Sequence, residues 1–419
     1  MKMTAMELKL IRFLEKHKVP LLYAMATLLS MAARFVLRGL VSGDMEWFLL
    51  PWARVLKERG GILALDSQVG NYGVLYQTII SLMTYLPIQF EYSYKIFSIL
   101  FDYALAIVSA AIVKDYSGSR IKSFLTYALL TMLPTVILNS SAWGQCDSIY
   151  VFFCVLCIWL MIREKYTLAF LSYGLAFAFK LQAIFLAPFL IFYYLKEKKF
   201  SIFAFLLIPL MMLLSSLAGI LEGRGLLSPF QIYHEQTGFY ASLYLNYPSF
   251  WALMTTNNVE GVYHSLSGFC SVFTVFLLFL ELILQLKSRD LLSPERLLFS
   301  AFLMTYTSVL FLPNMHDRYS YMYVILGLML AILEPKTVPS FIGLTLLDLQ
   351  TYGTFLFDPA RFPAKEDETV ILTSVPLPLL SLVNLACFLS YVFIFRKQLF
   401  SFSPEKQIQR LRQEQANKN

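Results

Sequence analysis

Charged side chains are scarce in this sequence. Asp, Glu, Lys and Arg make up only 15% of the 419 residues, whereas about 25% is usual in soluble domains. No polar block interrupts the apolar runs between residues 19 and 395. This pattern excludes an ordinary water-soluble enzyme, a disordered chain and a small disulfide-stapled domain. The 58% of hydrophobic residues instead predicts one all-α polytopic membrane domain over residues 1–395, followed by a basic cytoplasmic tail over 396–419.

Histidine and cysteine are also rare. The four histidines form no HExxH sequence, which argues against a zinc hydrolase. Four of the five cysteines lie inside apolar runs, where a thiol behaves as a small hydrophobic group. The CxxC of Cys154 and Cys157 lacks the polar flanks of a zinc or redox site. We therefore expect the cysteines to pack rather than to bind metal.

The apolar runs predict about 12 transmembrane helices, with a range of 11 to 13. Several runs are shorter than the roughly 20 residues that a perpendicular span needs, so we expect short or broken helices shielded by their neighbours. The runs are 19–40, 95–113, 123–140, 148–162, 167–179, 181–195, 201–220, 266–286, 297–313, 319–334, 337–357 and 370–395.

The distribution of basic residues predicts the orientation of these helices. If 73–89 is a juxtamembrane helix rather than another span, most of the 34 Lys and Arg residues face the cytoplasm, as the positive-inside rule prefers. Orientation of loops in a cell membrane then explains the net charge of +7 better than nucleic-acid binding does. Both termini are cytoplasmic in this arrangement, and long outer loops cover 41–94 and 221–265. The cytoplasmic turns carry no clustered acids or histidines, so we expect any chemistry on the extracytoplasmic face.

Two carboxylates, Asp44 and Glu46, follow the first predicted span at the water boundary. A carboxylate in this position can act as a general base toward a hydroxyl. Alternatively, Asp44 caps the helix that follows. Arg34 and Arg38 lie one helical turn apart near the end of the same span, so they could hold a phosphate together or extend to the interface.

The segment SAWGQCDSIY lies between the third and fourth predicted spans, at the outer surface. Trp143 offers a flat aromatic ring and Gln145 an amide, a combination that suits a sugar ring. Asp147 or Ser148 could instead cap the following helix.

Three further outer segments carry polar groups. Lys180 is an isolated cation in a predicted helical hairpin, so we expect it to meet an anion such as a lipid headgroup or a bound phosphate. His316, Asp317 and Arg318 are consecutive, and because adjacent helical residues do not share a face, this triplet lines a turn more readily than it forms a metal site. The loop 221–265 is rich in Tyr, Asn and Gly, which suits a neutral or lipid-linked carbohydrate, or a lid.

Together these segments resemble the GT-C superfamily of integral-membrane glycosyltransferases, most closely its bacterial branch related to the GPI-anchor second mannosyltransferase. SGDMEWFLLPW is similar to the acidic motif of that group's first loop, and WGQCDSIY to its WGQYDS signature. KLQAIFLAP is similar to its Lys-Gln segment, and MHDRYSY to its HERY-like motif. Cys146 and Asp317 depart from the usual Tyr and Glu of these motifs.

The resemblance implies transfer of a hexose from a polyprenyl-phosphate-linked donor to a surface glycan or lipid-linked acceptor outside the cell. Asp44 would be the catalytic base, and Glu46 a second carboxylate that orients the acceptor or a divalent cation, Mg²⁺ or Mn²⁺. The residues implied in binding the donor phosphate are Arg38, Lys180, His316 and Arg318. Those implied in contacting the sugar are Trp143, Gln145 and Asp147. Direct attack by the acceptor hydroxyl would invert the anomeric centre.

Two other classes remain open. A transporter or lipid flippase would carry acids at mid-membrane depth and repeated broken helices; Asp102, Glu281 and Asp348 are the few acids within the predicted spans, and no repeat is evident. A polysaccharide polymerase or ligase would also have a large outer loop, but commonly with several arginines. Here Arg224 is the only arginine in 221–265.

Overall fold

The computed structural model describes residues 3–236, 240–287, 294–357 and 375–400. Helices account for most of these residues, and the strands found there are the two-residue β1 (Tyr244–Leu245) and β2 (Met315–His316). The predicted all-α class is therefore confirmed. Of the predicted basic tail, 401–419 lie outside the described residues.

The chain divides into two compact units, which are considered separately. The first comprises Met1–Ala183, Ala204–Phe239 and Asp348–Ser374, and the second comprises Ile184–Phe203, Tyr240–Leu347 and Val375–Asn419. One helix, α17 (Val338–Phe357), passes from the second unit into the first.

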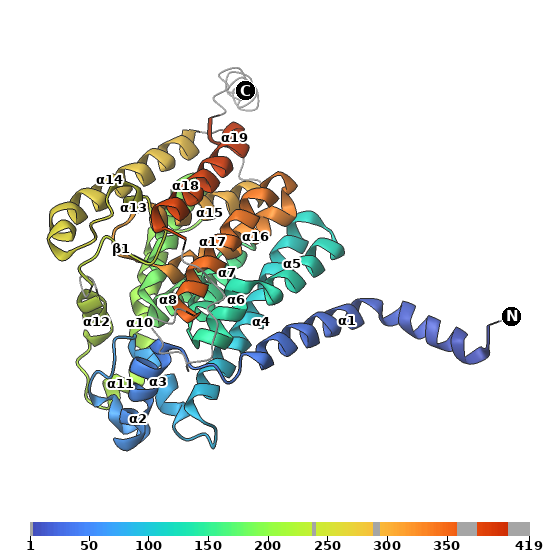
Figure 1. Cartoon of the computed structure of the whole chain (residues 1–419), viewed down its shortest axis with the longest axis horizontal. Coiled ribbons are helices and arrows are strands. Elements are labelled where there is room, and N and C mark those ends of the chain that lie inside the picture. Colours follow the sequence, from blue (N-terminus) through green and yellow to red (C-terminus); the bar gives the residue numbers. More distant parts are fainter. Residues whose placement is uncertain (1–2, 237–239, 288–293, 358–374, 401–419) are drawn as a thin grey trace, which may run out of the picture. The chain divides into compact units, whose positions relative to one another are not determined.

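The first unit is a bundle of helices. Helix α4 packs against α5 and α7, α7 packs against α8, and α8 packs against α10 (Figure 1). The bounds are α1 (Ala5–Val36), α2 (Leu50–Glu58), α3 (Val74–Met83), α4 (Phe90–Ser117), α5 (Arg120–Met132), α6 (Pro134–Ile137), α7 (Asp147–Ile162), α8 (Tyr166–Phe179), α10 (Leu207–Ser215), α11 (Leu217–Leu221) and α12 (Ser228–Gln236).

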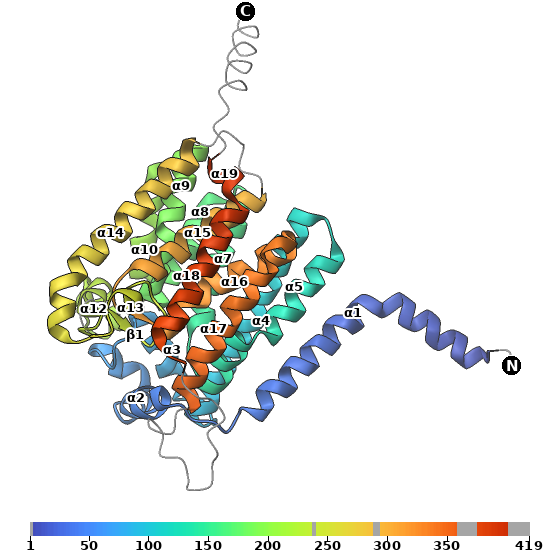
Figure 2. The same cartoon turned by 45° about the horizontal axis from the view of Figure 1, so that its top comes forward.

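Helix α1 begins at a capping box, in which Thr4 and Glu7 each bond to the backbone N–H of the other. Pro20 lies inside the helix, where it removes one backbone hydrogen bond, and α1 is bent along its length (Figure 2). The C-terminal part of α1 packs against α5. This part leads directly to Asp44.

Within the described ranges, four helices are long and apolar enough to cross a membrane. They are α1 from Met6, α4, α14 (Glu260–Lys287) and α18 (Leu377–Ile394). Helix α5 and the segment Pro134–Trp143 meet at a bend of 47° and together could form a fifth span. Other apolar helices have only 10–17 residues, among them α3, α7 and α8. Short and broken helices were expected, whereas the count of about 12 spans stays a prediction.

The second unit contains the remaining helices and the β1–β2 pair, which is parallel with Tyr244 opposite Met315. Helix α14 packs against α9 and α15, and α15 packs against α16. The bounds are α9 (Ala187–Glu197), α13 (Trp251–Met254), α15 (Pro294–Phe311), α16 (Tyr321–Leu333) and α19 (Arg396–Phe400), together with α14, α17 and α18 as given above.

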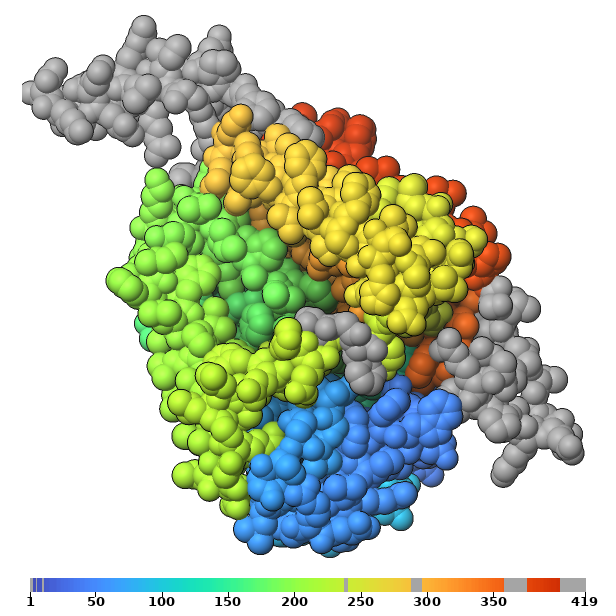
Figure 3. All heavy atoms as spheres, turned by 90° about the vertical axis from the view of Figure 1, so that its left-hand side faces the viewer, coloured from blue at the N-terminus to red at the C-terminus, as the bar shows by residue number. Residues whose placement is uncertain are grey.

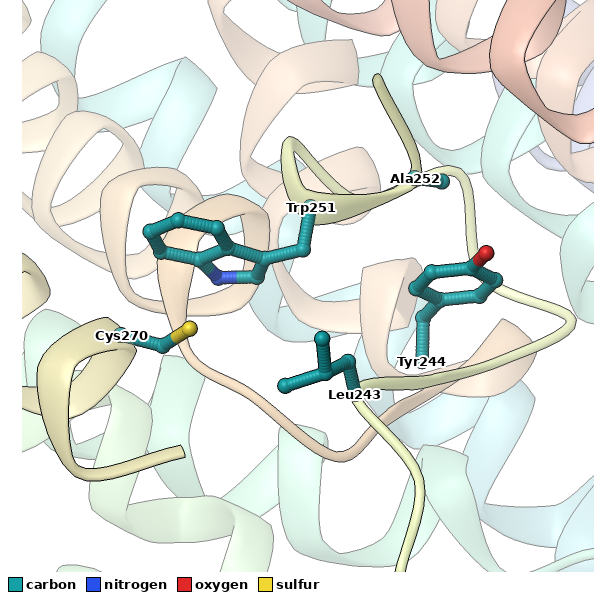
Figure 4. Packing of buried hydrophobic residues seen from close by; sticks show 5 residues of the cluster. All are labelled: Leu243, Tyr244, Trp251, Ala252 and Cys270. Carbon is teal, nitrogen blue, oxygen red and sulfur yellow. The ribbon is translucent and has the colours of Figure 1, made fainter. Parts of the chain in front are cut away.

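A small apolar cluster fixes the strand pair and α13 in the second unit. The Trp251 indole lies near Leu243 and Cys270, with Tyr244 and Ala252 beside them (Figure 4). Its Nε1 donates a hydrogen bond to the carbonyl of Phe311, at 2.6 Å. All five cysteines are buried thiols, and for the four in apolar runs this is the expected packing as hydrophobic groups.

Candidate functional site

Asp44 is held by two side chains from a distant part of the first unit. Its Oδ2 accepts hydrogen bonds from Trp143 Nε1 and from Gln145 Nε2, both at 2.8 Å. The Asp44 side chain does not cap the turn that follows it. The helix-cap alternative is therefore wrong, because the carboxylate faces the Trp-Gly-Gln segment instead. Two motifs that the resemblance assigns to one site thus meet at one oxygen atom.

The backbone of both segments departs from regular α-helix beside this contact. A π-helical turn, Met45–Leu49, follows Asp44, and another, Leu138–Trp143, precedes Gly144. Such turns are rare and recur at functional sites. The Ser42 hydroxyl joins the two segments, because it donates to the carbonyl of Trp143 at 2.8 Å and accepts from the N–H of Met45 at 3.2 Å.

The Trp143 indole is buried between other rings. It stacks on Phe355 with the ring centroids 4.2 Å apart and 14° between the planes, and Tyr352 meets it edge-on at 5.1 Å. The expected stacking of a sugar on Trp143 does not fit this burial. In the structure Trp143 supports Asp44 through its N–H, while its ring packs in the bundle.

Asp147, two residues after Gln145, forms a buried ion pair with Lys180. Lys180 Nζ contacts Asp147 Oδ1, and Asn139 Nδ2 donates to Asp147 Oδ2 at 2.8 Å. Lys180 does meet an anion, but the anion is a carboxylate of the same chain. Asp147 does not cap α7, and the Ser148 hydroxyl donates to the carbonyl of Ser98 at 3.0 Å. The helix-cap alternative is thus wrong for Asp147, and Ser148 is used elsewhere.

Arg34 and Arg38 do not act as a pair. Arg34 is buried and forms an ion pair of 2.9 Å with Asp102, and it also donates to the carbonyl of Thr131 at 2.7 Å. Helix α1 ends at Val36, so Arg38 lies beyond the helix and does not share the helical face of Arg34. Its guanidinium is exposed over the ring of Phe35. The expectation that both would hold one phosphate is wrong for Arg34.

Lys95, a buried residue that was not predicted to have a role, binds backbone carbonyls of the segment that precedes Asp44. Lys95 in α4 donates to the carbonyls of Arg38 at 3.0 Å and of Leu37 at 3.3 Å, and also to that of Leu40. Carbonyls at a helix C-terminus lack helical partners and attract a cation. The signal available in the sequence is a single lysine at the very start of the second predicted span.

The two acidic residues of the first loop have different surroundings. Asp44 is half-buried, whereas Glu46 is exposed. Among the described residues, no three His, Cys, Asp or Glu side chains converge as a set of metal ligands. The Mg²⁺ or Mn²⁺ that the resemblance implies at Asp44 and Glu46 stays a prediction.

In the second unit, His316, Asp317 and Arg318 line a turn, as predicted. His316 ends β2, and the next residues form a 3₁₀ turn over Asp317–Ser320. The imidazole meets the ring of Tyr240 edge-on at 5.0 Å, and Asp317 accepts a hydrogen bond from Asn246 at 3.1 Å. The phosphate-binding role implied for His316 and Arg318 stays a prediction.

The start of the large outer loop is tied to the first outer segment within the first unit. Arg224 is buried, and its guanidinium donates to Gln68 Oε1 at 2.9 Å and to Gln77 Oε1 at 2.7 Å. Burial lowers the pKa of Arg224, and the nearby Asp66 carboxylate opposes that shift. Figure 3 shows this part of the chain, in yellow-green, beside the first outer segment in blue. Arg224 and Gln236 thus fasten the start of the loop to that segment, and the choice between a carbohydrate-binding surface and a lid over the helix ends stays open.

Comparison with known proteins adds no family assignment. No protein-family model matches the chain, and no curated protein matches its sequence. The functional assignment therefore depends on the geometry around Asp44 and on the motif resemblance.

Proposed function

We propose that this protein is an integral-membrane glycosyltransferase of the GT-C type, with about 12 spans and an active site on the extracytoplasmic face of the cell membrane. It transfers a hexose from a polyprenyl-phosphate-linked donor to a surface glycan or lipid-linked acceptor. One observation carries the proposal. The indole of Trp143 and the amide of Gln145 both donate to the Asp44 carboxylate, although 99 and 101 residues separate them from it.

Asp44 is suited to act as the general base. Its carboxylate is half-buried and oriented by two N–H donors on Oδ2. As the acceptor oxygen attacks the anomeric carbon, its proton passes to Asp44 and the bond between the sugar and the phosphate oxygen breaks. A single displacement of this kind inverts the anomeric centre.

The leaving phosphate needs cations, because negative charge grows on it as the glycosidic bond breaks. Lys180 and Arg38 supply positive charge in the first unit. Lys180 is buried and paired with Asp147, so a donor phosphate would share this cation with the carboxylate, whereas the guanidinium of Arg38 is exposed. Gln145 and Asp147 are buried, like Trp143, so the sugar-contacting role that the resemblance implies for them stays a prediction. Asp44 and Glu46 are the residues that would hold a divalent cation, which would supply further positive charge at the leaving phosphate.

An Asp44→Asn variant tests the proposed base. It keeps the size and both hydrogen-bonded neighbours of the side chain but removes the proton acceptor. In the native host, at wild-type protein level, we expect transfer of one sugar to the surface glycan to fall about 100-fold or more, measured by compositional analysis of the glycan.

The matched control is Asp66→Asn in the same outer segment. Asp66 forms an exposed pair with Arg59, so its replacement should leave glycan composition unchanged. A wild-type amount of the sugar in the Asp44→Asn strain would refute the proposed function.

A transporter or lipid flippase is the second candidate. The observation in its favour is the buried ion pair between Arg34 in α1 and Asp102 in α4, since ionisable groups inside a membrane often mark a transport pathway. A transporter would require the charges of this pair and would tolerate Asp44→Asn. The glycosyltransferase proposal makes the opposite prediction for both sites.

A further inference from the structure

We propose that Tyr72 is a positioning residue for Asp44 and that it acts through Gln145. The proposal rests on the proposed role of Asp44 as the base. Tyr72 lies in the irregular stretch between the 3₁₀ turn that ends at Asp66 and the start of α3 at Val74. Arg224 holds this stretch in place.

The polarity of the Gln145 amide is set by its two neighbours. A carboxylate accepts hydrogen bonds, so the amide must present its N–H₂ end to Asp44 and its oxygen to the other side. On that side the Tyr72 hydroxyl donates to Gln145 Oε1 at 2.8 Å. Gln145 is only 2% exposed, so an amide oxygen without this donor would have little water to replace it. The Tyr72 hydroxyl therefore keeps the donating end of Gln145 on Asp44.

The Tyr72 ring is itself held from several directions. Trp52 and Tyr76 meet it edge-on, with centroids at 5.6 Å and 5.1 Å. The Lys180 ammonium lies 5.8 Å from its centroid, within the range of a cation–π contact. Tyr72 thus contacts both Gln145, which donates to the Asp44 carboxylate, and Lys180, which pairs with Asp147.

The backbone at Tyr72 lacks the support of a regular element. A 3₁₀ turn ends at Asp66, and α3 begins only at Val74. Two glutamine side chains compensate, since the Tyr72 carbonyl accepts from Gln77 Nε2 at 2.6 Å and from Gln68 Nε2 at 3.0 Å.

Arg224 orients both of these glutamines. Its guanidinium donates to the Oε1 atoms of Gln68 and Gln77, which turns the amide nitrogens toward the Tyr72 carbonyl. It also donates to the carbonyls of Leu65 and Ser67 in the same stretch. A planar fork with five N–H groups can serve several acceptors at once, which lysine cannot. An unbroken series of contacts thus connects Arg224 with Asp44.

A double-mutant cycle tests the positioning role. Tyr72→Phe removes the hydroxyl alone, and Gln145→Ala removes the amide. We measure sugar transfer to the surface glycan in the native host, divided by the amount of protein in the membrane. Tyr72→Phe should lower the rate about tenfold. In the Gln145→Ala background it should cause no further loss, because the hydroxyl acts only through that amide. Independent losses that multiply would overturn the proposal.

Tyr85→Phe is the matched control. The Tyr85 hydroxyl also bonds to backbone of the first outer segment, at Gly60 and Ile62, but has no link to Gln145. It should leave the rate within twofold of wild type. An equal loss in the two tyrosine variants would mean a general structural effect and would overturn the proposal.

Gln145→Glu provides a test that does not depend on how well the Tyr72 variant accumulates. The change is nearly isosteric but places a second carboxyl group against Asp44. The two groups would share a proton, which weakens Asp44 as a base, so transfer should be lower than in Gln145→Ala. Wild-type transfer would overturn the assigned polarity.

Asp44→Asn, measured in parallel, separates this inference from the proposed function. Transfer lost in Asp44→Asn but unchanged in Tyr72→Phe would overturn the positioning role and leave the glycosyltransferase proposal standing. Transfer retained in Asp44→Asn would remove both.

Discussion

Gly144 lies directly against Met45, and a Cβ atom added at Gly144 would be only 2.6 Å from the Met45 sulfur. Gly144 separates Trp143 from Gln145, and Met45 follows Asp44. The close approach of these two residues therefore allows both side-chain donors to reach the same carboxylate. Gly144 also has a φ of +73°, which side chains other than glycine rarely adopt. Glycine is required here for two separate reasons.

Gly144→Ala should therefore destabilise the protein more than the same change at Gly118. Gly118 has a φ of +64° but open space around it, so its replacement isolates the backbone strain, about 1–2 kcal/mol. Gly144→Ala adds overpacking against Met45, about 1–3 kcal/mol more. Denaturant unfolding of the purified variants in detergent would measure both. Equal losses at the two positions would contradict the close contact.

The sequence predicts the helices best where charges bound an apolar run. The runs 148–162 and 167–179 correspond closely to α7 (Asp147–Ile162) and α8 (Tyr166–Phe179). The run 266–286 is shorter than α14, which begins at Glu260, because polar residues extend the helix beyond its apolar part. Helix length depends on backbone hydrogen bonds, and hydropathy records only the apolar stretch.

The candidate site was predictable as a set of motifs but not as a set of contacts. The motif resemblance placed Asp44, Trp143 and Gln145 together, and the structure does bring them into contact. Local sequence could not show that Lys180 pairs with Asp147, 33 residues away, because either residue alone looks like a partner for a ligand or a helix end. Tyr72 was missed for a similar reason, since one tyrosine among 25 carries no local signal.

The buried pair of Lys180 and Asp147 should matter far more for stability than an exposed pair. Lys180→Met leaves the Asp147 carboxylate buried without its cation, which should cost about 3–5 kcal/mol. Arg163→Met breaks an exposed pair with Asp115 and should cost at most about 1 kcal/mol. The free energy of unfolding in detergent, compared between the two variants, checks this. Similar values for both would show that Lys180 does not stabilise Asp147.

The pair of Arg34 and Asp102 discriminates between the two candidate functions. Arg34→Met alone should destabilise the protein by about 3–5 kcal/mol, because it removes one partner of a buried ion pair. Adding Asp102→Asn removes the remaining charge and should recover part of that loss. If the pair is structural, the double variant transfers sugar at a nearly wild-type rate per molecule in the membrane. A stable double variant without function would instead favour the transporter.

The placement of residues 73–89 on the outer surface can be tested by labelling introduced cysteines on intact cells. The five native cysteines are buried, so an impermeant maleimide should react little with the wild-type protein. Ser67 and Arg120 are both exposed, and they lie on either side of α3 and α4. With 73–89 at the outer surface, α4 is the one crossing between them, so Ser67→Cys should be labelled on intact cells and Arg120→Cys only after permeabilisation. Labelling of Arg120→Cys on intact cells would mean that 73–89 crosses the membrane, and the basic turns that follow would then face outward, against the preference of lysine and arginine for the cytoplasm.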